Sequence, residues 1–355
     1  MRIGGWLAAF AALALAGCKS GGDTTSASST TGTTGAATTS GTTGVVSGKT
    51  FKIVMIAKSN DNPVFQFAKT GAEKAAEDLS KETGTAISID WQTPPKEDGQ
   101  EQAKRIAAAV SGGANCVLLS CSVAEKVTGA INDAVEKGVP VMTFDSDAPN
   151  SKRFAFYGTN DIECGKEVMS ELAKLTNGNA NVAILAGSQD APNLKLRVQG
   201  VEDEAKKYPG IKIILVANHV ETPADASAKV KQVMLNNPQV NAWAMVGGWP
   251  LFATSLLDEL DPAKVKVVSV DALPAELAYV EKGIAPVLLA QPCYDWGRVS
   301  VGLIVDKFLT KKDVPVMNDM KLVRVTKENL GEWAQTLQSW GATVDPKYLA
   351  MAKKP

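Results

Sequence analysis

The sequence predicts an α/β protein with two lobes, each built on a doubly wound parallel sheet. Three observations lead to this prediction. Apolar runs rich in β-branched residues recur along the chain, helical stretches lie between most of them, and about 300 residues follow a polar N-terminal segment. Strands of near-continuous apolar character are typical of parallel sheets covered by helices on both faces. About ten strands fit two such sheets better than one, and this length is enough for two ordinary domains.

The predicted elements alternate along the chain, as right-handed crossovers require. We expect strands at residues 51–57, 87–91, 116–120, 140–145, 182–187, 212–218, 242–247, 265–271 and 286–291. Apolar residues at three- and four-residue spacing predict helices that include 67–79, 101–110, 123–135, 164–175, 226–235 and 296–309.

The N-terminus has the pattern of an export signal. Arg2 precedes an uncharged run at 4–16, which is 13 residues long. This run is too short to cross a bilayer core of about 30 Å as a helix. The segment Leu15-Ala16-Gly17-Cys18 closes it and resembles the lipobox of bacterial lipoproteins, which predicts cleavage before Cys18 and lipidation of that cysteine. The alternative is a signal peptide that a cysteine follows by chance.

Residues 18–49 are almost entirely Ser, Thr, Gly and Ala. Such a composition cannot bury enough surface to offset its ordering entropy, so we expect a flexible linker. The domain prediction is therefore a signal peptide at 1–17, a lipidated Cys18 with its linker at 18–49, and a globular body from residue 50.

Charge and rare residues exclude several classes of function. Lys and Arg total 37 against 38 Asp and Glu, with no basic block, so a nucleic-acid partner is not expected, and the membrane is expected only through the lipid anchor. His219 is the only histidine, which excludes a multi-histidine metal site. No phosphate-binding loop or serine nucleophile motif is present. We expect no enzyme activity, no metal and no cofactor.

The globular body contains four cysteines, which we interpret as packing residues: Cys116, Cys121, Cys164 and Cys293. The alternative is that one pair of them is oxidised.

Polar and aromatic side chains follow the predicted strands, where open α/β sheets bind their ligands. Carboxylates, amides and a guanidinium beside flat rings suit a sugar or polyol, because they bond to adjacent hydroxyls while the rings cover C–H faces. Capping of the next helix is the alternative role for any one of these polar residues. The candidates are Asn62, Phe65, Ser120, Asp145, Asn193, Arg197, Trp249 and Asp271.

Motifs in a fixed order across about 51–325 resemble the ribose-binding group of periplasmic sugar-binding proteins, the substrate-binding components of ABC importers. They are Asn60-Asp-Asn-Pro-Val-Phe65, Gly138-Val-Pro-Val-Met-Thr-Phe-Asp145, Tyr157-Gly-Thr-Asn160, Asn193-Leu-Lys-Leu-Arg-Val-Gln-Gly200, Val270-Asp271 and Ala290-Gln291.

The resemblance implies Rossmann-like lobes joined by a hinge of three crossings, with the sugar held in a cleft between them. Position by position, it implies sugar contacts from Asn62 and Phe65, a hydroxyl-gripping carboxylate at Asp145, an Asn-x-x-x-Arg pattern at Asn193 and Arg197, and a second-lobe carboxylate and hinge-side glutamine at Asp271 and Gln291.

Two departures from the family pattern concern the ligand. Ser146 follows Asp145 where ribose binders carry Arg, and Gly247-Gly248 with Trp249 stands where many members have an Asn-Asp pair. These differences argue against ribose itself and favour a larger or differently shaped ligand. Trp249 is expected to stack on that ligand, with packing against a helix as the alternative.

The family order also predicts how the body divides. Lobe 1 is expected at 50–158 plus about 292–320, and lobe 2 at 159–291 plus about 321–355. The segment from Glu328 onward exceeds the usual family length. Its Trp333, Leu337 and Trp340 lie at helical spacing and predict an extra helix packed on a lobe.

The predicted function is an extracytoplasmic solute-binding lipoprotein, expected as a monomer, that captures a monosaccharide or polyol and delivers it to an ABC permease. It would be lipid-anchored to a bacterial membrane, in the periplasm or on the cell surface. One alternative is a sugar-sensing protein that presents its ligand to a membrane receptor. A glycosidase using Asp145 and Asp271 as its carboxylate pair is the enzymatic alternative. A transcription regulator of this fold would need an N-terminal helix-turn-helix, where this chain has an export signal.

Overall fold

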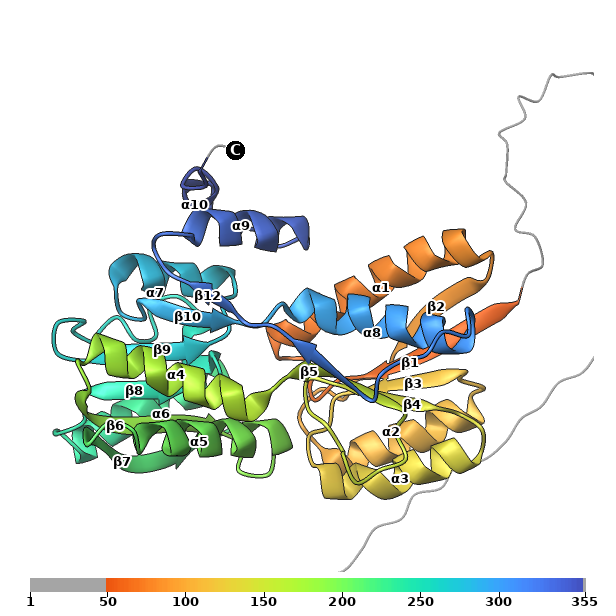
Figure 1. Cartoon of the computed structure of the whole chain (residues 1–355), viewed down its shortest axis with the longest axis horizontal. Helices are drawn as coiled ribbons and strands as arrows, with labels where there is room; N and C mark the ends of the chain where they lie inside the picture. Colours follow the sequence, from red (N-terminus) through yellow and green to blue (C-terminus); the bar gives the residue numbers. More distant parts are fainter. Residues whose placement is uncertain (1–48, 354–355) are drawn as a thin grey trace, which may run out of the picture. The chain divides into compact units, whose positions relative to one another are not determined.

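The computed structural model describes residues 49–353. The predicted signal peptide, Cys18 and nearly all of the predicted linker lie outside the described residues. Within them, the chain forms two six-stranded sheets flanked by helices, which confirms the predicted fold class (Figure 1). Elements built on the first sheet are called lobe 1 below, and those on the second sheet lobe 2.

The sheet of lobe 1 is parallel throughout, in the order β2-β1-β3-β4-β5-β11. Side chains alternate along β1: Ile53 and Met55 pack on the side of α1 and α8, while Val54 and Ile56 pack on the side of α2 and α3. The elements are β1 (Thr50–Ile56), α1 (Pro63–Thr83), β2 (Ala86–Trp91), α2 (Gly99–Ser111), β3 (Cys116–Leu119), α3 (Ala124–Glu136), β4 (Val141–Phe144), β5 (Ala155–Thr159), α8 (Cys293–Phe308) and β11 (Met317–Met320).

The sheet of lobe 2 repeats this order as β7-β6-β8-β9-β10-β12, with only β12 antiparallel. Its elements are α4 (Asp161–Leu175), β6 (Asn179–Gly187), α5 (Pro192–Ala205), β7 (Gly210–Asn218), α6 (Pro223–Asn236), β8 (Ala242–Met245), η1 (Trp249–Leu251), β9 (Lys266–Val270), η2 (Pro274–Glu276), α7 (Leu277–Lys282), β10 (Val287–Ala290) and β12 (Val323–Val325).

The chain passes between the two sheets three times within residues 49–353: after β5, after β10 and after β11. Asn160 begins the first passage and caps α4, because its side chain accepts a hydrogen bond from the Glu163 amide at 3.2 Å. Figure 1 shows these connections between the lobes. In proteins that move by hinge closure, a few residues in such connections absorb the change in backbone angles.

The sequence patterns missed three short strands: β5, β11 and β12. They are three to five residues long and contain glycine or polar residues, so they lack the continuous apolar run that reveals the equally short β3 and β10. The apolar segment between β8 and β9 forms only the 3-10 helix η1. Ser255, with φ of 72°, interrupts the right-handed helical path there.

The C-terminal segment contains α9 (Leu330–Ser339) and α10 (Pro346–Leu349), in agreement with the predicted extra helix. Trp333 belongs to the core of lobe 2, and its Nε1 donates to the Ala272 carbonyl at 2.7 Å. Trp340 packs beside Trp333, with 5.4 Å between ring centroids, and also reaches lobe 1. Its ring stacks on Tyr294 at 5.9 Å between centroids and meets Phe67 edge-on at 6.1 Å. The segment therefore connects the lobes a fourth time, through aromatic contact.

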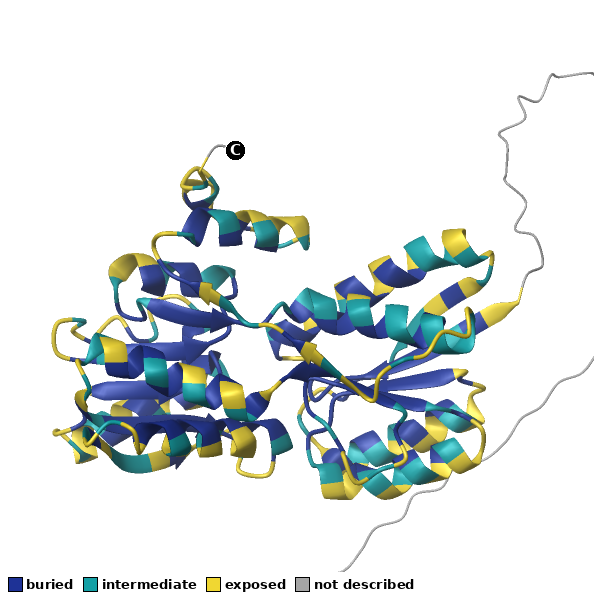
Figure 2. Ribbon diagram, viewed as in Figure 1, coloured by how far each residue is buried: buried dark blue, intermediate teal, exposed yellow. Residues whose placement is uncertain are grey.

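Burial follows the layers of the fold, with both sheets buried beneath half-exposed helices (Figure 2). The four cysteines of the described part are free and buried, which agrees with their interpretation as packing residues. None of the helices between residues 49 and 353 combines the length and the apolar character needed to cross a bilayer.

Candidate functional site

The carboxyl ends of strands from both lobes converge on a small internal cavity of about 30 Å³. A sugar ring does not fit in this volume, because side chains of the two lobes contact one another directly, as in the bond from Asn193 Nδ2 to Asp145 Oδ1 at 3.3 Å. Eight of the nine predicted ligand-binding residues line it, and the ninth, Ser120, lies behind it and donates to Asp145 Oδ2 at 2.8 Å. The lining consists of Lys58, Asn62, Val64, Phe65, Asp145, Asn193, Leu194, Arg197, Glu221, Gly247, Trp249, Asp271, Gln291 and Trp296.

Asp145 and Asp271 occupy equivalent places in the two lobes. Each directly follows a strand, β4 or β9, and each has a left-handed backbone, with φ of 56° and 76°. Asp tolerates this conformation at a cost, and such strain concentrates at binding sites, where it aims a side chain. Burial raises the pKa of both carboxyls, while hydrogen bonds from Ser120 and Gln291 favour their charged forms.

Arg197 connects the carboxylates of lobe 2. Its Nε donates to Asp161 Oδ1 at 2.8 Å, its Nη1 to the Val246 carbonyl at 3.1 Å and its Nη2 to Gln291 Oε1 at 2.7 Å. Gln291 Nε2 in turn donates to Asp271 Oδ1 at 2.8 Å. Burial disfavours the guanidinium charge, but Asp161 keeps the pKa of Arg197 above its ordinary value. Two of the five guanidinium donors remain for a ligand.

Helix packing fixes the position of Arg197. Helices α4 and α5 approach so closely at Gly165 that a Cβ there would lie 1.9 Å from the Arg197 carbonyl oxygen. Only a glycine allows this contact, which seats the first turns of α5 against α4. Asn193, one turn earlier on α5, donates from Nδ2 to Asp145 Oδ1 at 3.3 Å and so reaches across to lobe 1.

Aromatic rings form one wall of the cavity. Phe65 stacks on Trp296 at 6.0 Å and meets Phe144 edge-on at 6.4 Å. The sequence pattern placed Trp296 only on a helical core stripe. Its indole Nε1 is buried and has no hydrogen-bond partner among the described residues. A buried N–H without a partner is costly, so a hydrogen-bond acceptor is missing beside Trp296 in this arrangement of the lobes.

Trp249 explains why Gly247-Gly248 stands where the family pattern has an Asn-Asp pair. A Cβ on Gly247 would lie 2.5 Å from the indole ring, so the missing side chain is the space that Trp249 fills. The ring is 4% exposed, belongs to the core of lobe 2 and also lines the cavity. It therefore combines the packing role with a surface that a ligand can contact.

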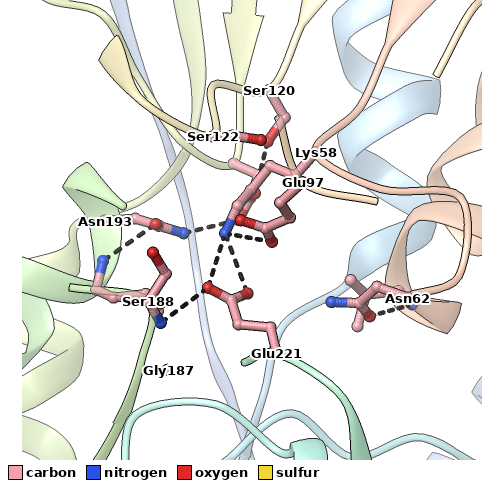
Figure 3. Close-up of polar contacts among 12 residues, drawn as sticks. Lys58, Asn62, Glu97, Ser120, Ser122, Gly187, Ser188, Asn193 and Glu221 are labelled. Carbon is pink, nitrogen blue, oxygen red and sulfur yellow. Dashed lines mark hydrogen bonds and ion pairs between the residues drawn. The ribbon is translucent and has the colours of Figure 1, made fainter. Parts of the chain in front are cut away.

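A charged cluster that the sequence did not indicate joins the lobes beside this cavity (Figure 3). Lys58 follows β1 in lobe 1, and its Nζ lies 3.1 Å from Glu97 Oε1 and 3.1 Å from Glu221 Oε2. Glu221 belongs to lobe 2, where the Ser188 amide donates to its Oε1 at 3.2 Å. The sequence gives no sign that Glu221 belongs to this cluster, because its contact with Lys58 joins two segments that are 163 positions apart.

The two carboxyls of this cluster titrate differently. Burial raises the pKa of Glu97 to about 8, although Lys58 opposes that shift. Burial acts on Glu221 in the same direction, but the Lys58 charge and its hydrogen bonds leave the pKa of Glu221 below its ordinary value. The Lys58–Glu221 contact is therefore a true ion pair near neutral pH, with Glu97 as a carboxyl that gains or loses a proton there.

The sequence matches the periplasmic binding protein domain over residues 53–312. The chain belongs to this family. It is 24% identical over 277 residues to the D-allose-binding periplasmic protein of Escherichia coli, covering 74% of this chain and 86% of that one. It is 23% identical over 189 residues to the D-apiose import binding protein of Actinobacillus succinogenes, covering 53% and 59%. The chain thus spans about three-fifths of the length of that relative.

Solved structures agree with the two-lobed fold. The glucose-galactose binding protein of Geobacillus stearothermophilus is 25% identical, with a TM-score of 0.73 over 79% of this chain and 99% of that one. The α9–α10 segment follows the end of the family match at residue 312.

Proposed function

We propose that this chain is an extracytoplasmic solute-binding lipoprotein that captures an uncharged sugar or polyol between its lobes and delivers it to an ABC-type importer. The supporting observation is the convergence of Asp145, Asp271, Arg197, Asn193 and the Phe65–Trp296 wall on one cavity from both lobes. Relatives named for D-allose and D-apiose support the same ligand class.

The site chemistry favours a neutral polyhydroxylated ligand. Two carboxylates accept hydrogen bonds from hydroxyls, while Arg197 and the Trp296 indole donate to ring or hydroxyl oxygens. Aromatic faces cover apolar C–H surfaces. Three carboxylates and two cations line the cavity, so negative charges already outnumber positive ones. A ligand carboxylate or phosphate would add to this excess of buried negative charge.

Capture requires lobe motion, because the cavity of about 30 Å³ has no room for a sugar ring. We propose that the three strand connections act as the hinge and that ligand shifts the population toward a closed form with the sugar inside. A ligand shifts such an equilibrium only by its preference for one form. The ligand would leave chemically unchanged.

We further propose that Cys18 carries a lipid anchor and that residues 18–49 tether the two-lobed body to a bacterial membrane. Two or more acyl chains hold a protein firmly, whereas one holds it weakly. Replacing Cys18 by Ser should release the full chain from the membrane fraction while sugar binding persists. Continued membrane attachment of Cys18→Ser would contradict the anchor.

A thermal-shift screen of the full chain against pentoses, hexoses and polyols tests the proposed binding. A ligand stabilises by RT ln(1 + [L]/Kd), so at least one sugar should raise the melting temperature in a concentration-dependent way. Sugar acids and sugar phosphates of the same stereochemistry serve as matched controls and should shift it less. A flat response to every neutral sugar would contradict the proposal.

A further inference from the structure

The cleft holds a second, larger cavity outside the charged cluster. Its volume is about 640 Å³, and both lobes line it. Cavities of roughly 300–1,000 Å³ bury most of a small organic ligand, so this outer chamber has room for a sugar ring. It is lined by Ser59, Asp61, Pro95, Lys96 and Glu97 from lobe 1 and by Gly187, Ser188, Gln189, Asn218, His219, Val220, Glu221, Thr222 and Asp225 from lobe 2.

The outer chamber adjoins the inner cavity at one shared residue. Glu221 lines both, and its ion pair with Lys58 stands at the boundary between them (Figure 3). Lys58 lines the inner cavity and Ser59, its neighbour in the chain, lines the outer chamber. The two spaces therefore lie in one interlobe cleft, divided by the side chains of Lys58 and Glu221.

The outer chamber offers an apolar surface in contact with the inner wall. Val220 is 67% exposed, which is unusual for a large apolar side chain of this protein. The adjacent His219 ring meets Trp249 edge-on at 4.9 Å between centroids, and Trp249 lines the inner cavity. The side chains of Trp249, His219 and Val220 thus form one apolar surface that runs from the inner cavity to the outer chamber. Such a surface suits the C–H faces of a sugar.

Polar groups of the outer chamber supply hydrogen bonds without favouring an anion. His219 Nδ1 lies 2.7 Å from the Val220 carbonyl, so Nδ1 carries the proton and Nε2 is an acceptor without a partner in the described part of the chain. Nε2 is buried, so it reaches a ligand only when the ring turns toward the chamber. Asp61, Glu221 and Asp225 outnumber Lys96 among the lining charges. A neutral hydroxylated group fits this lining better than a carboxylate or phosphate.

We propose that the outer chamber is a second subsite, and that the preferred ligand is a neutral two-unit saccharide or glycoside. One ring occupies the inner site and the second unit lies in the chamber against Val220 and His219. Lys58 and Glu221 move aside or bond to the linkage between the units. This inference rests on the proposed sugar-binding function and names its substrate class.

Isothermal titration of the full chain with matched probes tests the subsite. The probes are the monosaccharide with the largest thermal shift, its methyl glycoside, and disaccharides that carry the same terminal ring. At least one disaccharide should bind about tenfold more tightly than the methyl glycoside. Val220→Asp should reverse most of that gain and leave the monosaccharide affinity within about twofold.

Leu235→Asp is the matched control, because Leu235 is 83% exposed on α6 and lines neither cavity, so it should change neither affinity. Disaccharides that bind no better than the methyl glycoside would overturn the subsite alone. An equal loss for both ligands in Val220→Asp would overturn it as well. Failure of every sugar to bind would instead overturn the proposed function, and the subsite with it.

Discussion

The lobes contact one another on two sides, and the two contacts differ in chemistry. In the cleft, contact is polar: Lys58 pairs with Glu221 at 3.1 Å, and Asn193 bonds to Asp145 at 3.3 Å. At the C-terminal segment, contact is aromatic, through Trp340 stacked on Tyr294. Ligand hydroxyls compete for the polar contacts, whereas no hydroxyl replaces a stacked ring. The polar contacts in the cleft should therefore change when a ligand binds. The aromatic contact should stabilise the closed form by the same amount with and without ligand.

The largest expected effect is a loss of stability when the contact between the C-terminal segment and lobe 2 is removed. Trp333→Ala removes a buried indole and its bond to Ala272, and should lower the free energy of unfolding by about 3–5 kcal/mol. Urea denaturation followed by circular dichroism measures this loss. Trp340→Ala is the matched comparison, because that ring is only half-buried, and should cost clearly less. Equal losses would contradict the assignment of Trp333 to the core.

The second effect concerns the polar contact. Asp145→Ala or Asp271→Ala removes a charge-assisted acceptor and should weaken sugar binding by about 1.5–3 kcal/mol. Titration calorimetry with the sugar identified by thermal shift measures the change. Arg298→Ala on α8, a partly exposed residue outside the cavity, should leave affinity unchanged. Unaltered binding in both Asp variants would contradict the site.

A third effect tests whether the aromatic contact favours closure. Trp340→Ala removes its stacking on Tyr294, worth about 0.5–1.5 kcal/mol beyond area burial, and should weaken sugar binding by at most that amount. This loss should not change with salt, because stacked rings carry no net charge. An unchanged affinity would show that the rings stay in contact in open and closed forms alike.

A further effect is a pH dependence of the charged cluster. Burial raises the pKa of Glu97 from 4.5 to about 8, so the folded protein holds this proton more tightly than the unfolded chain. The free energy of unfolding should therefore fall as pH rises from about 4.5 through about 8. Melting temperatures measured across this window should show that fall, and Glu97→Gln should reduce it.

Glu136→Gln is the control for this pH dependence. Glu136 is exposed beside Lys152, its pKa lies below 4.5, and it does not titrate in the window. If the melting temperatures of Glu97→Gln and the wild type followed parallel pH profiles, that result would contradict the protonation assigned to Glu97.

The sequence predicted the two sheets and most strand-end residues because both depend on local patterns. Apolar runs define the strands, and the sheet topology then places Asp145 at the carboxyl edge of the first sheet and Asp271 at the carboxyl edge of the second. The Lys58–Glu221 pair could not be predicted in this way, since it depends on how two lobes meet. Trp296 was hidden for a different reason: its helical spacing is that of an ordinary core residue, and only the structure shows that it faces the cavity.

The most direct test of the account is a calorimetric titration of the full chain with the best sugar from the thermal-shift screen, followed by analysis of the recovered sugar. We predict saturable binding of one ligand per chain, with the sugar recovered intact. A chain that binds no neutral saccharide at any concentration tested, or that returns the sugar cleaved, would contradict capture between two closing lobes.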